Sequence, residues 1–428
     1  MSYPIYERYR PSRIEWAPSI PADWDECAVK INYSMQLGKM LQNEASTLFD
    51  VEISYLKALH VNWNRVTTEA LPKMWASPSE LESYAVQNGD LLVCEGGEVG
   101  RAAILEGLDE PAIIQNAVHR IRNTSRGDVR YFSYLLRNIA DAGWFAILCN
   151  KATIAHLTVE KLGSIQMPVP PLFEQTQITK FLDWKTGQID ALIAKKKELM
   201  EKLKEKRLAV INQAVTKGLN FAAPMRNSGI PWLGEIPLHW DVTSLRWFLK
   251  TGSGDFLSNE DMERDQDNLH TVPVIGGNGV MAYTSNPNTK THCLIVGRVG
   301  AHCGNVHLIR EKCWVTDNAL RIAVIDETFD SGFLYWLLKA MNLNDDANRN
   351  AQPLITGETI KSKKVVLPPI AEQVLIADYI TQQFALIATM QSKVESAIVR
   401  LTEYRTAVIT AATTGKIDVR QVAIPAPT

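Results

Sequence analysis

The sequence lacks the features that would place the chain in a membrane or outside the cell. It has no run of ~18 apolar residues, the length that a membrane-spanning helix needs. Its start, from Met1 to Arg10, lacks the apolar core of a secretory signal peptide. Six cysteines with no CxxC pair do not form a disulfide framework in a chain of 428 residues. We therefore expect a cytoplasmic protein that does not bind a membrane.

The common catalytic motifs are also missing. There is no Gly-x-x-x-x-Gly-Lys-Ser/Thr phosphate loop, no HExxH and no GxSxG. The Asp/Asn-Pro-Pro-Tyr/Phe tetrapeptide of amino-methylating DNA methyltransferases is absent as well, because Val169-Pro170-Pro171-Leu172 and Leu367-Pro368-Pro369-Ile370 have other first and fourth residues. We expect no catalytic residue and no cofactor in this chain.

One cluster of histidines and cysteines suggests a zinc site at first sight. Adjacent residues of a strand point to opposite faces, so a His-Cys pair does not easily converge on one metal. We therefore expect no metal site, and buried thiols with ordinary strand histidines instead, at His292-Cys293, His302-Cys303, His307 and Cys313.

The charge balance excludes a polybasic DNA coat. The chain has 45 basic and 47 acidic residues, a net charge of −2, and 46% hydrophobic residues, which are ordinary values for a globular protein. The charge is unevenly spread: residues 169–219 have a net charge of +4 and residues 1–168 a net charge of −4. A lysine run on a helix is usually a solvated face, so the basic stretch alone is weak support for nucleic-acid binding.

The chain contains an internal repeat. Eight residues of the first copy, including two tryptophans, recur at the same spacing in the second. They are Arg10, Ser12, Ile14, Trp16, Ile20, Pro21, Trp24 and Asp25, which match Arg226, Ser228, Ile230, Trp232, Ile236, Pro237, Trp240 and Asp241. A second block repeats as well: Pro-Pro-Leu-Phe-Glu-Gln at 170–175 matches Pro-Pro-Ile-Ala-Glu-Gln at 368–373. This pattern indicates tandem duplication of a domain followed by a helix.

Each Pro-Pro pair precedes a long helical pattern. Proline in the first turn needs no N–H partner, Glu174 and Glu372 suit the positive end of the helix dipole, and Gly218 and Gly415 mark the ends. The apolar residues recur with alternating spacings of three and four, which is a heptad pattern. Two separate surface helices are the alternative, but the matched length and phase favour an antiparallel two-helix coiled coil. Its predicted interface comprises Ile189, Leu192, Leu199, Leu203, Val210, Ile387, Met390, Val394, Leu401, Tyr404 and Val408.

We predict an α+β protein in which two mixed α/β domains are separated by two long helices, with an internal pseudo-twofold repeat. The predicted boundaries are residues 1–168 and 220–366 for the domains, 169–219 and 367–417 for the helices, and 418–428 for a tail. Within each domain, apolar runs flank a glycine-rich turn at 91–105 and at 294–309, which predicts a hairpin rather than a phosphate loop.

Candidate DNA contacts lie at or near these hairpins. Arginine, lysine and asparagine are the side chains that read base edges and phosphates, although each alone is more often an ordinary surface group. The residues selected by chemistry and position are Asn62, Asn64, Arg65, Arg101, Lys151, Asn278, Lys290, Arg298 and Arg321.

Taken together, the repeated Ser-x-Ile-x-Trp…Ile-Pro-x-x-Trp segment and the repeated Pro-Pro-Leu/Ile-x-Glu-Gln helix entry resemble the specificity subunit of type I restriction–modification systems. The resemblance covers essentially the whole chain. It implies that each domain is a target recognition domain for one half of a bipartite site in double-stranded DNA, and that the helices set the spacer and dock the methylation subunits. It also implies two methylation subunits that bind S-adenosylmethionine and a motor–nuclease subunit that uses ATP and Mg²⁺. The chain itself would be non-catalytic.

Two other function classes are alternatives. One is a coiled-coil scaffold without DNA binding. The other is a fused restriction–methylation enzyme, which the missing methyltransferase tetrapeptide argues against.

Overall fold

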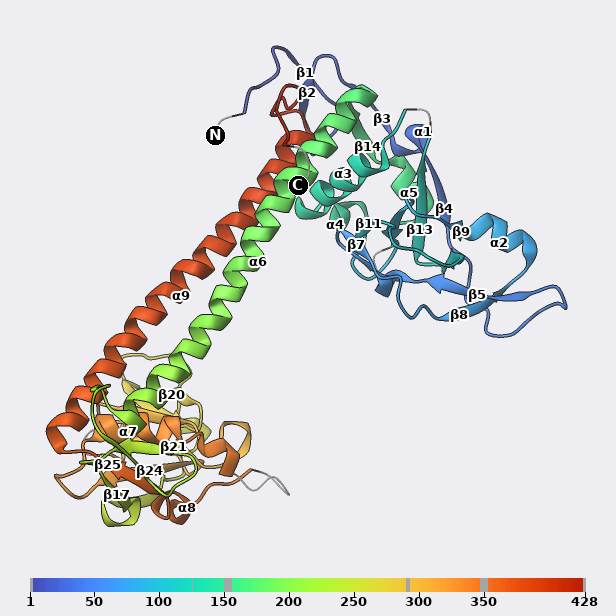
Figure 1. Cartoon of the computed structure of the whole chain (residues 1–428). Helices are drawn as coiled ribbons and strands as arrows, with labels where there is room; N and C mark the ends of the chain where they lie inside the picture. The colour runs from blue at the N-terminus through green and yellow to red at the C-terminus, as the bar shows by residue number, and fades with distance from the viewer. Residues whose placement is uncertain (1–2, 125, 150–155, 290–292, 347–352, 426–428) are drawn as a thin grey trace. The chain divides into compact units, whose positions relative to one another are not determined.

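The computed structural model describes residues 3–124, 126–149, 156–289, 293–346 and 353–425. The chain divides into two compact units (Figure 1). Unit 1 comprises residues 1–195 and 396–428, and unit 2 comprises residues 196–395. Each unit therefore contains one globular domain and one end of each of two long helices.

The globular part of unit 1 is built from short strands and helices. In chain order they are β1 (Tyr9–Pro11), β2 (Ser19–Pro21), β3 (Asp25–Ala28), α1 (Val29–Asn32), β4 (Tyr33–Leu37), β5 (Val51–Leu56), η1 (Ala58–His60), β6 (Val61–Asn62), β7 (Arg65–Val66), β8 (Lys73–Ala76), α2 (Pro78–Tyr84), β9 (Ala85–Val86), β10 (Leu91–Cys94), β11 (Ala102–Ile104), β12 (Ala112–Ile114), β13 (Val118–Asn123), α3 (Val129–Asp141), α4 (Trp144–Leu148), α5 (Val159–Ser164) and β14 (Gln166–Val169).

Two four-stranded sheets form the centre of this domain. One has the order β11-β10-β13-β4 and is antiparallel throughout; the other has the order β8-β5-β12-β9, with β5 and β12 parallel. The predicted glycine-rich hairpin is confirmed, since Leu91 of β10 pairs with Ile104 of β11. A separate two-stranded ladder joins β3 to β14 and brings the end of the domain back to its beginning.

Unit 2 has a related set of elements. They are β15 (Met225–Asn227), β16 (Glu235–Pro237), β17 (Asp241–Ser244), η2 (Leu245–Trp247), β18 (Leu249–Ser253), η3 (Asn259–Asp261), β19 (Val272–Gly276), β20 (Gly279–Thr284), β21 (Cys293–Gly297), η4 (Gly300–His302), β22 (Val306–Ile309), β23 (Trp314–Val315), β24 (Ala319–Val324), α7 (Ser331–Ala340), η5 (Leu343–Asp346), α8 (Gly357–Lys361) and β25 (Lys364–Leu367).

The strand order of unit 2 follows the same plan. An antiparallel sheet has the order β18-β24-β21-β22, a smaller sheet has the order β20-β19-β23 with β19 and β23 parallel, and β17 pairs with β25. The second predicted hairpin is confirmed, because Leu294 of β21 pairs with Leu308 of β22.

Two long helices contribute to both units. Helix α6 (Leu172–Lys217, 46 residues) begins in unit 1 and ends in unit 2, whereas α9 (Ile370–Thr413, 44 residues) begins in unit 2 and ends in unit 1. Gly218 and Gly415 follow their ends with φ angles of +71° and +72°, the left-handed conformation that glycine adopts at helix ends. Both predicted helices are confirmed. No helix in the described part of the chain is long and apolar enough to cross a membrane.

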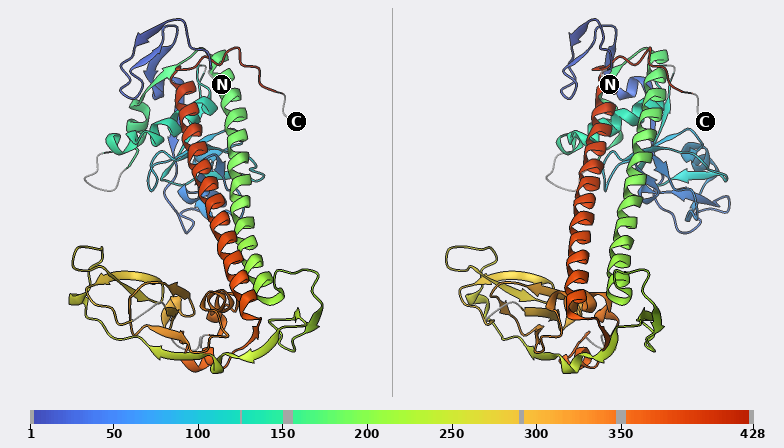
Figure 2. Two further views of the ribbon diagram at one scale, coloured as in Figure 1. Left: turned by 90° about the vertical axis from the view of Figure 1, so that its left-hand side faces the viewer. Right: turned by 60° about the vertical axis from the view of Figure 1, so that its left-hand side comes forward.

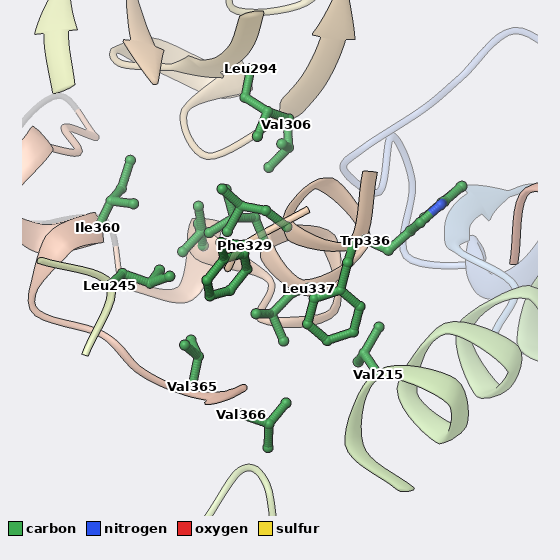
Figure 3. Close-up of a cluster of buried hydrophobic side chains, with 14 of the residues drawn as sticks. Val215, Leu245, Leu294, Val306, Phe329, Trp336, Leu337, Ile360, Val365 and Val366 are labelled. Carbon is green, nitrogen blue, oxygen red and sulfur yellow. The ribbon is translucent and has the colours of Figure 1, made fainter. Parts of the chain in front are cut away.

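Each hydrophobic core draws on both long helices. In unit 2, Val215 of α6 packs with Leu337 of α7 and Phe384 of α9, and Figure 3 shows Val215 beside the cluster that contains Phe329 and Leu337. In unit 1, Phe181 of α6 and Ile409 of α9 join one core. Burying apolar area at ~25 cal/mol per Å² is the dominant stabilising term, so the helix ends are integral parts of the two units.

Candidate functional site

The repeated tryptophan and the repeated glutamate meet in both units. In unit 1, the indole Nε1 of Trp24 donates to Glu174 Oε1 at 3.1 Å, and the buried Tyr6 hydroxyl donates to the same oxygen. Burial and this hydrogen bond raise the pKa of Tyr6 far above its usual value. In unit 2, Trp240 Nε1 donates to Glu372 Oε2 at 3.0 Å. The first turn of each long helix is thus bonded to the strand segment that opens the preceding domain.

The arginine of the repeated motif completes this joint. Arg10 Nη2 donates to the Trp24 carbonyl oxygen at 2.7 Å, and Arg226 Nη2 donates to the Trp240 carbonyl oxygen at 2.6 Å. Figure 2 shows β1 and β2 beside the end of α9 in unit 1, where a Cβ on Gly415 would lie 2.4 Å from the Pro21 ring. The repeated residues therefore have a structural role: they hold the start of each domain against the long helices.

The repeated glutamine holds the main helix of each domain. Gln175 is fully buried; its Oε1 accepts from Asp128 N at 3.0 Å, and its Nε2 donates to Pro170 O at 2.9 Å and Arg126 O at 3.2 Å. Asp128 is also the N-cap of α3. One amide side chain therefore connects the start of α6, the loop before it and the start of α3.

Gln373 makes the equivalent bonds in unit 2. Its Oε1 accepts from Asp330 N at 2.8 Å, and its Nε2 donates to Thr328 O at 2.8 Å and Pro368 O at 2.9 Å. Asp330 is the N-cap of α7. A carboxylate could not replace this amide, because a carboxylate cannot donate to two carbonyl oxygens.

The predicted helix-interface residues differ in burial. Ile189, Leu203, Ile387, Val394 and Val408 are buried, and Val210 and Leu401 are partly buried. Leu192, Leu199, Met390 and Tyr404 are 41–50% exposed, whereas their neighbours Ile193, Met200, Gln391 and Arg405 are more buried. The buried positions still recur with heptad spacing. At every second position of the predicted interface, however, the more buried residue is the one that follows the predicted residue.

Polar contacts accompany this burial in unit 1. Arg405 Nε of α9 donates to Asp190 Oδ1 of α6 at 2.9 Å, and the Thr410 hydroxyl donates to Asn138 Oδ1 of α3 at 2.6 Å. In unit 2 the contacts at the helices include aromatic ones: the Arg207 guanidinium lies 4.3 Å from the Phe384 ring centroid in a cation–π contact, and the Trp336 ring centroid lies 4.5 Å from the same centroid.

Three of the candidate DNA contacts in unit 1 are exposed. Asn62, Asn64 and Arg65 lie on the hairpin of β6 and β7, with Asn64 at a φ angle of +68°. Trp63 anchors this hairpin: its Nε1 donates to Glu98 Oε1, and the Arg137 guanidinium lies 4.7 Å from the ring centroid. The Arg65 guanidinium lies 4.0 Å from the exposed Glu69 carboxylate, and the amides of Asn62 and Asn64 are exposed. Such a hairpin is suited to hydrogen bonding with an external polar ligand.

Arg101 is engaged within the protein. Its Nη1 donates to Glu98 Oε2 at 3.2 Å and its Nη2 to the Ala58 carbonyl oxygen at 2.8 Å, while its Nε is buried without a partner among the described residues. The structure therefore brings Arg101 close to the exposed hairpin, through Glu98, but uses it to hold two loops together.

In unit 2, Arg298 and Arg321 converge on one residue. Arg298 Nη1 donates to Ser253 Oγ at 3.2 Å, and Arg321 Nη2 donates to Ser253 O at 2.7 Å and pairs with Asp255. Asn278 is exposed at the turn between β19 and β20, next to Gly277, whose carbonyl oxygen is 3.2 Å from His307 Nε2. Two other candidates, Lys151 and Lys290, lie outside the described residues.

A glycine lets one loop of each unit start between the two sheets. A Cβ on Gly38 would lie 2.3 Å from the Gln115 carbonyl, and a Cβ on Gly254 would lie 2.1 Å from the Thr316 oxygen. The next residue forms a parallel bridge to the other sheet in both units, at Lys39 and at Asp255. Only glycine allows this approach.

The loops that follow these glycines carry exposed apolar residues that sequence reasoning missed. Asp50 accepts from Ser46 N at 2.8 Å and from Thr47 Oγ1 at 2.6 Å, which holds the tip that exposes Leu48 and Phe49. The loop of unit 2 exposes Phe256 and Leu269. A single apolar residue in a loop belongs to no motif. Only the structure therefore shows that each of these two loops exposes apolar side chains.

Two cysteines of the histidine–cysteine cluster, Cys293 and Cys313, belong to the smaller core of unit 2, whereas Cys303 belongs to its larger core. The thiol of Cys313 accepts a hydrogen bond from Cys293, which lowers the pKa of Cys313 to about 7. Cys303 donates to the Arg298 carbonyl oxygen, and His307 contacts Gly277. His292 lies outside the described residues, and within the described ranges no three His, Cys, Asp or Glu side chains are placed to hold a metal ion.

Comparisons with known proteins agree with this architecture. The family model described as "Type I restriction modification DNA specificity domain" matches residues 78–205 and 239–398. The EcoprrI specificity subunit from Escherichia coli is 28% identical in a match that covers 58% of this chain and 59% of the relative. The MjaVIII specificity subunit from Methanocaldococcus jannaschii is 21% identical, with 94% of each chain covered.

Solved structures share the fold. A chain from a structure described as concerning complex assembly and conformational transition of the type I R-M system has a TM-score of 0.71 at 12% identity, with 92% of this chain and 98% of that chain covered. The HsdS subunit from Thermoanaerobacter tengcongensis has a TM-score of 0.56 at 14% identity, with 93% and 98% covered. Because the family model matches more than half of the residues, once in each half, this chain belongs to the type I restriction–modification DNA specificity family.

Proposed function

We propose that this chain is the sequence-recognition subunit of a type I restriction–modification complex and that each globular domain reads one half of a bipartite DNA site. One observation carries the proposal: the specificity-domain family matches the chain twice, and each match runs from a globular domain into the long helix that follows it. The chain is a non-catalytic member of its complex. A scaffold without DNA binding is not favoured, because it does not account for two specificity domains in one chain.

The two halves are related by an internal pseudo-twofold repeat, and the helices pair as an antiparallel coiled coil that sets the spacer. The matching Trp–Glu and Gln bonds, the matching sheet orders and the heptad spacing of burial support this arrangement. The predicted domains at 1–168 and 220–366 and helices at 169–219 and 367–417 describe the repeat, with a tail at 418–428.

In each half, the DNA surface comprises an exposed hairpin or turn together with the loop that follows Gly38 or Gly254. In unit 1 this surface contains Asn62, Asn64 and Arg65 with the loop that exposes Phe49; in unit 2 it contains Asn278 with the loop that exposes Phe256. Side-chain amides and guanidinium groups bond base edges and phosphates, while exposed apolar groups contact the thymine methyl or stack on bases.

The partners are double-stranded DNA, two methylation subunits and motor–nuclease subunits, in the cytoplasm. S-adenosylmethionine, ATP and Mg²⁺ belong to those subunits, and this chain binds no cofactor or metal. The acidic first domain gains DNA affinity from local exposed cations and from charge on the methylation subunits.

Methylome sequencing tests the function. The chain is co-expressed with its methylation partner in a host without other adenine methylation, with the methylation subunit alone as the control. We expect N6-methyladenine at one split motif that is absent from the control. Failure to find a new motif with a soluble, assembled complex would reject the DNA-recognition proposal.

A further inference from the structure

The two ends of the helix pair differ in what covers them. Phe181 lies seven residues after Glu174 and is fully buried, whereas Tyr379 lies seven residues after Glu372 and is 38% exposed. Gln177 and Leu375 stand three residues after the same glutamates; Leu375 is 61% exposed. Equivalent positions of the repeat are therefore covered in unit 1 and open in unit 2.

In unit 1, the covering groups come from extended segments of the chain itself. The Tyr3 ring packs edge-on against Phe181 with 5.2 Å between ring centroids, and the Gln177 amide donates to the Val419 and Val422 carbonyl oxygens at 3.5 Å and 3.4 Å. The backbone N–H of Asp418 donates to Pro4 O at 2.8 Å, which joins the two segments. An aromatic side chain on an extended segment thus fills this end.

In unit 2, the equivalent end is an apolar groove of about 440 Å³, which we name the α6 groove. This volume is in the range of sites that hold a large side chain or a small ligand. The groove is lined mainly by Ala209, Val210, Ala214, Leu219, Phe221 and Tyr379. Phe221 is 83% exposed, so a substantial aromatic surface remains in contact with water.

The charge around the groove indicates the chemistry of its occupant. Lys206 lines it, and Lys217 lies exposed at the end of the same helix; neither takes part in a salt bridge within the described part of the chain. The segment 169–219 has a net charge of +4. An acidic residue beside an aromatic side chain would complement both features.

We propose that the α6 groove binds an extended segment of a partner subunit, and that this segment inserts an aromatic side chain flanked by acidic residues, as Tyr3 fills the equivalent place in unit 1. This inference rests on the internal repeat and the partner subunits proposed above. The groove makes the two ends of a near-symmetric chain unequal: one end is closed by its own polypeptide, and the other is completed by a partner.

Groove-filling and charge-reversal variants of the full chain test this proposal. Ala209→Trp fills the groove from an exposed helix position, and Lys206→Glu reverses its charge. Ala191→Trp and Lys195→Glu, at exposed positions of α6 in unit 1, are the matched controls. Affinity for the purified methylation subunit is measured by calorimetry. We expect each groove variant to weaken binding by about tenfold or more, as for a buried aromatic anchor, and each control to bind like the wild type.

A cross-link identifies the occupant. A photoreactive phenylalanine analogue at Tyr379 should cross-link, in the purified complex, to a partner segment that contains an aromatic and an acidic residue. Wild-type affinity of both groove variants would overturn the groove proposal and leave the proposed function intact. A wild-type chain that does not bind the methylation subunit would overturn the function itself. Self-association that Ala209→Trp abolishes would show a second copy as the occupant and also overturn the proposal.

Discussion

Replacing Gln373 by alanine should destabilise unit 2 strongly. The amide makes three hydrogen bonds of 2.8–2.9 Å and is fully buried. At about 1 kcal/mol for each hydrogen bond, and with buried backbone groups left unpaired, the free energy of unfolding should fall by about 3 kcal/mol or more. For a unit of this size, that loss corresponds to a decrease in Tm of about 6–12 °C.

Hydrogen–deuterium exchange of the full chain locates the effect. In Gln373→Ala, peptides covering the start of α7 should lose protection because Asp330 N loses its acceptor, while peptides of α3 stay protected. Gln382→Ala, at an exposed position of the same helix, is the control and should change stability by no more than ~0.5 kcal/mol. Equal behaviour of Gln373→Ala and Gln382→Ala would refute the assignment of this amide as the joint between α9 and the domain.

Three further predictions concern other parts of the chain. His119 is fully buried, and burial lowers its pKa below 6.5. Its contribution to stability is therefore present above pH 6.5 and is lost as the pH falls, so the Tm should drop between pH 7.5 and 5. The drop should be smaller in His119→Gln, and parallel Tm profiles of the two proteins would contradict this prediction. Arg101→Ala should destabilise unit 1 by about 1–2 kcal/mol, because Arg101 bonds the Ala58 carbonyl oxygen. Arg65→Ala should leave the Tm unchanged and weaken DNA binding of the assembled complex. A lower Tm for Arg65→Ala, or weaker DNA binding for Arg101→Ala at an unchanged Tm, would contradict these roles. Inserting one heptad into each long helix adds about 10 Å, or ~3 base pairs of B-DNA. Methylome sequencing should therefore find a longer spacer between unchanged half-sites. Altered half-sites would contradict the proposal that the helices set the spacer.

The sequence predicted the helices well because their signals are local. Proline before the first turn, a glutamate within it and a glycine after the last turn each act within a few residues, and α6 and α9 begin and end where those signals stand. The rotation of the helices is harder to predict. A spacing of three and four residues is compatible with two neighbouring rows of residues facing the partner helix. In the structure, Arg405 and Gln391 are partly buried, whereas Tyr404 and Met390 are exposed.

The chemistry of the repeated motifs could not be predicted from their spacing. Trp24 and Glu174 are 150 residues apart, and the partners of Gln175 are mostly backbone atoms, which no residue pattern reveals. The same reason explains Arg101 and Arg321. An arginine near a glycine-rich hairpin looks like a ligand-binding residue until the structure shows carbonyl oxygens of distant loops as its acceptors.

The glycines at 38 and 254 have a consequence for how such a chain can change over generations. Each one fixes the root of a loop between two sheets, where no side chain fits. Beyond that root, the loop contributes little to either core. Insertions, deletions and substitutions at the tip should therefore be nearly neutral for folding while they alter the presented surface, so that surface can change over generations without rebuilding of the domain that carries it.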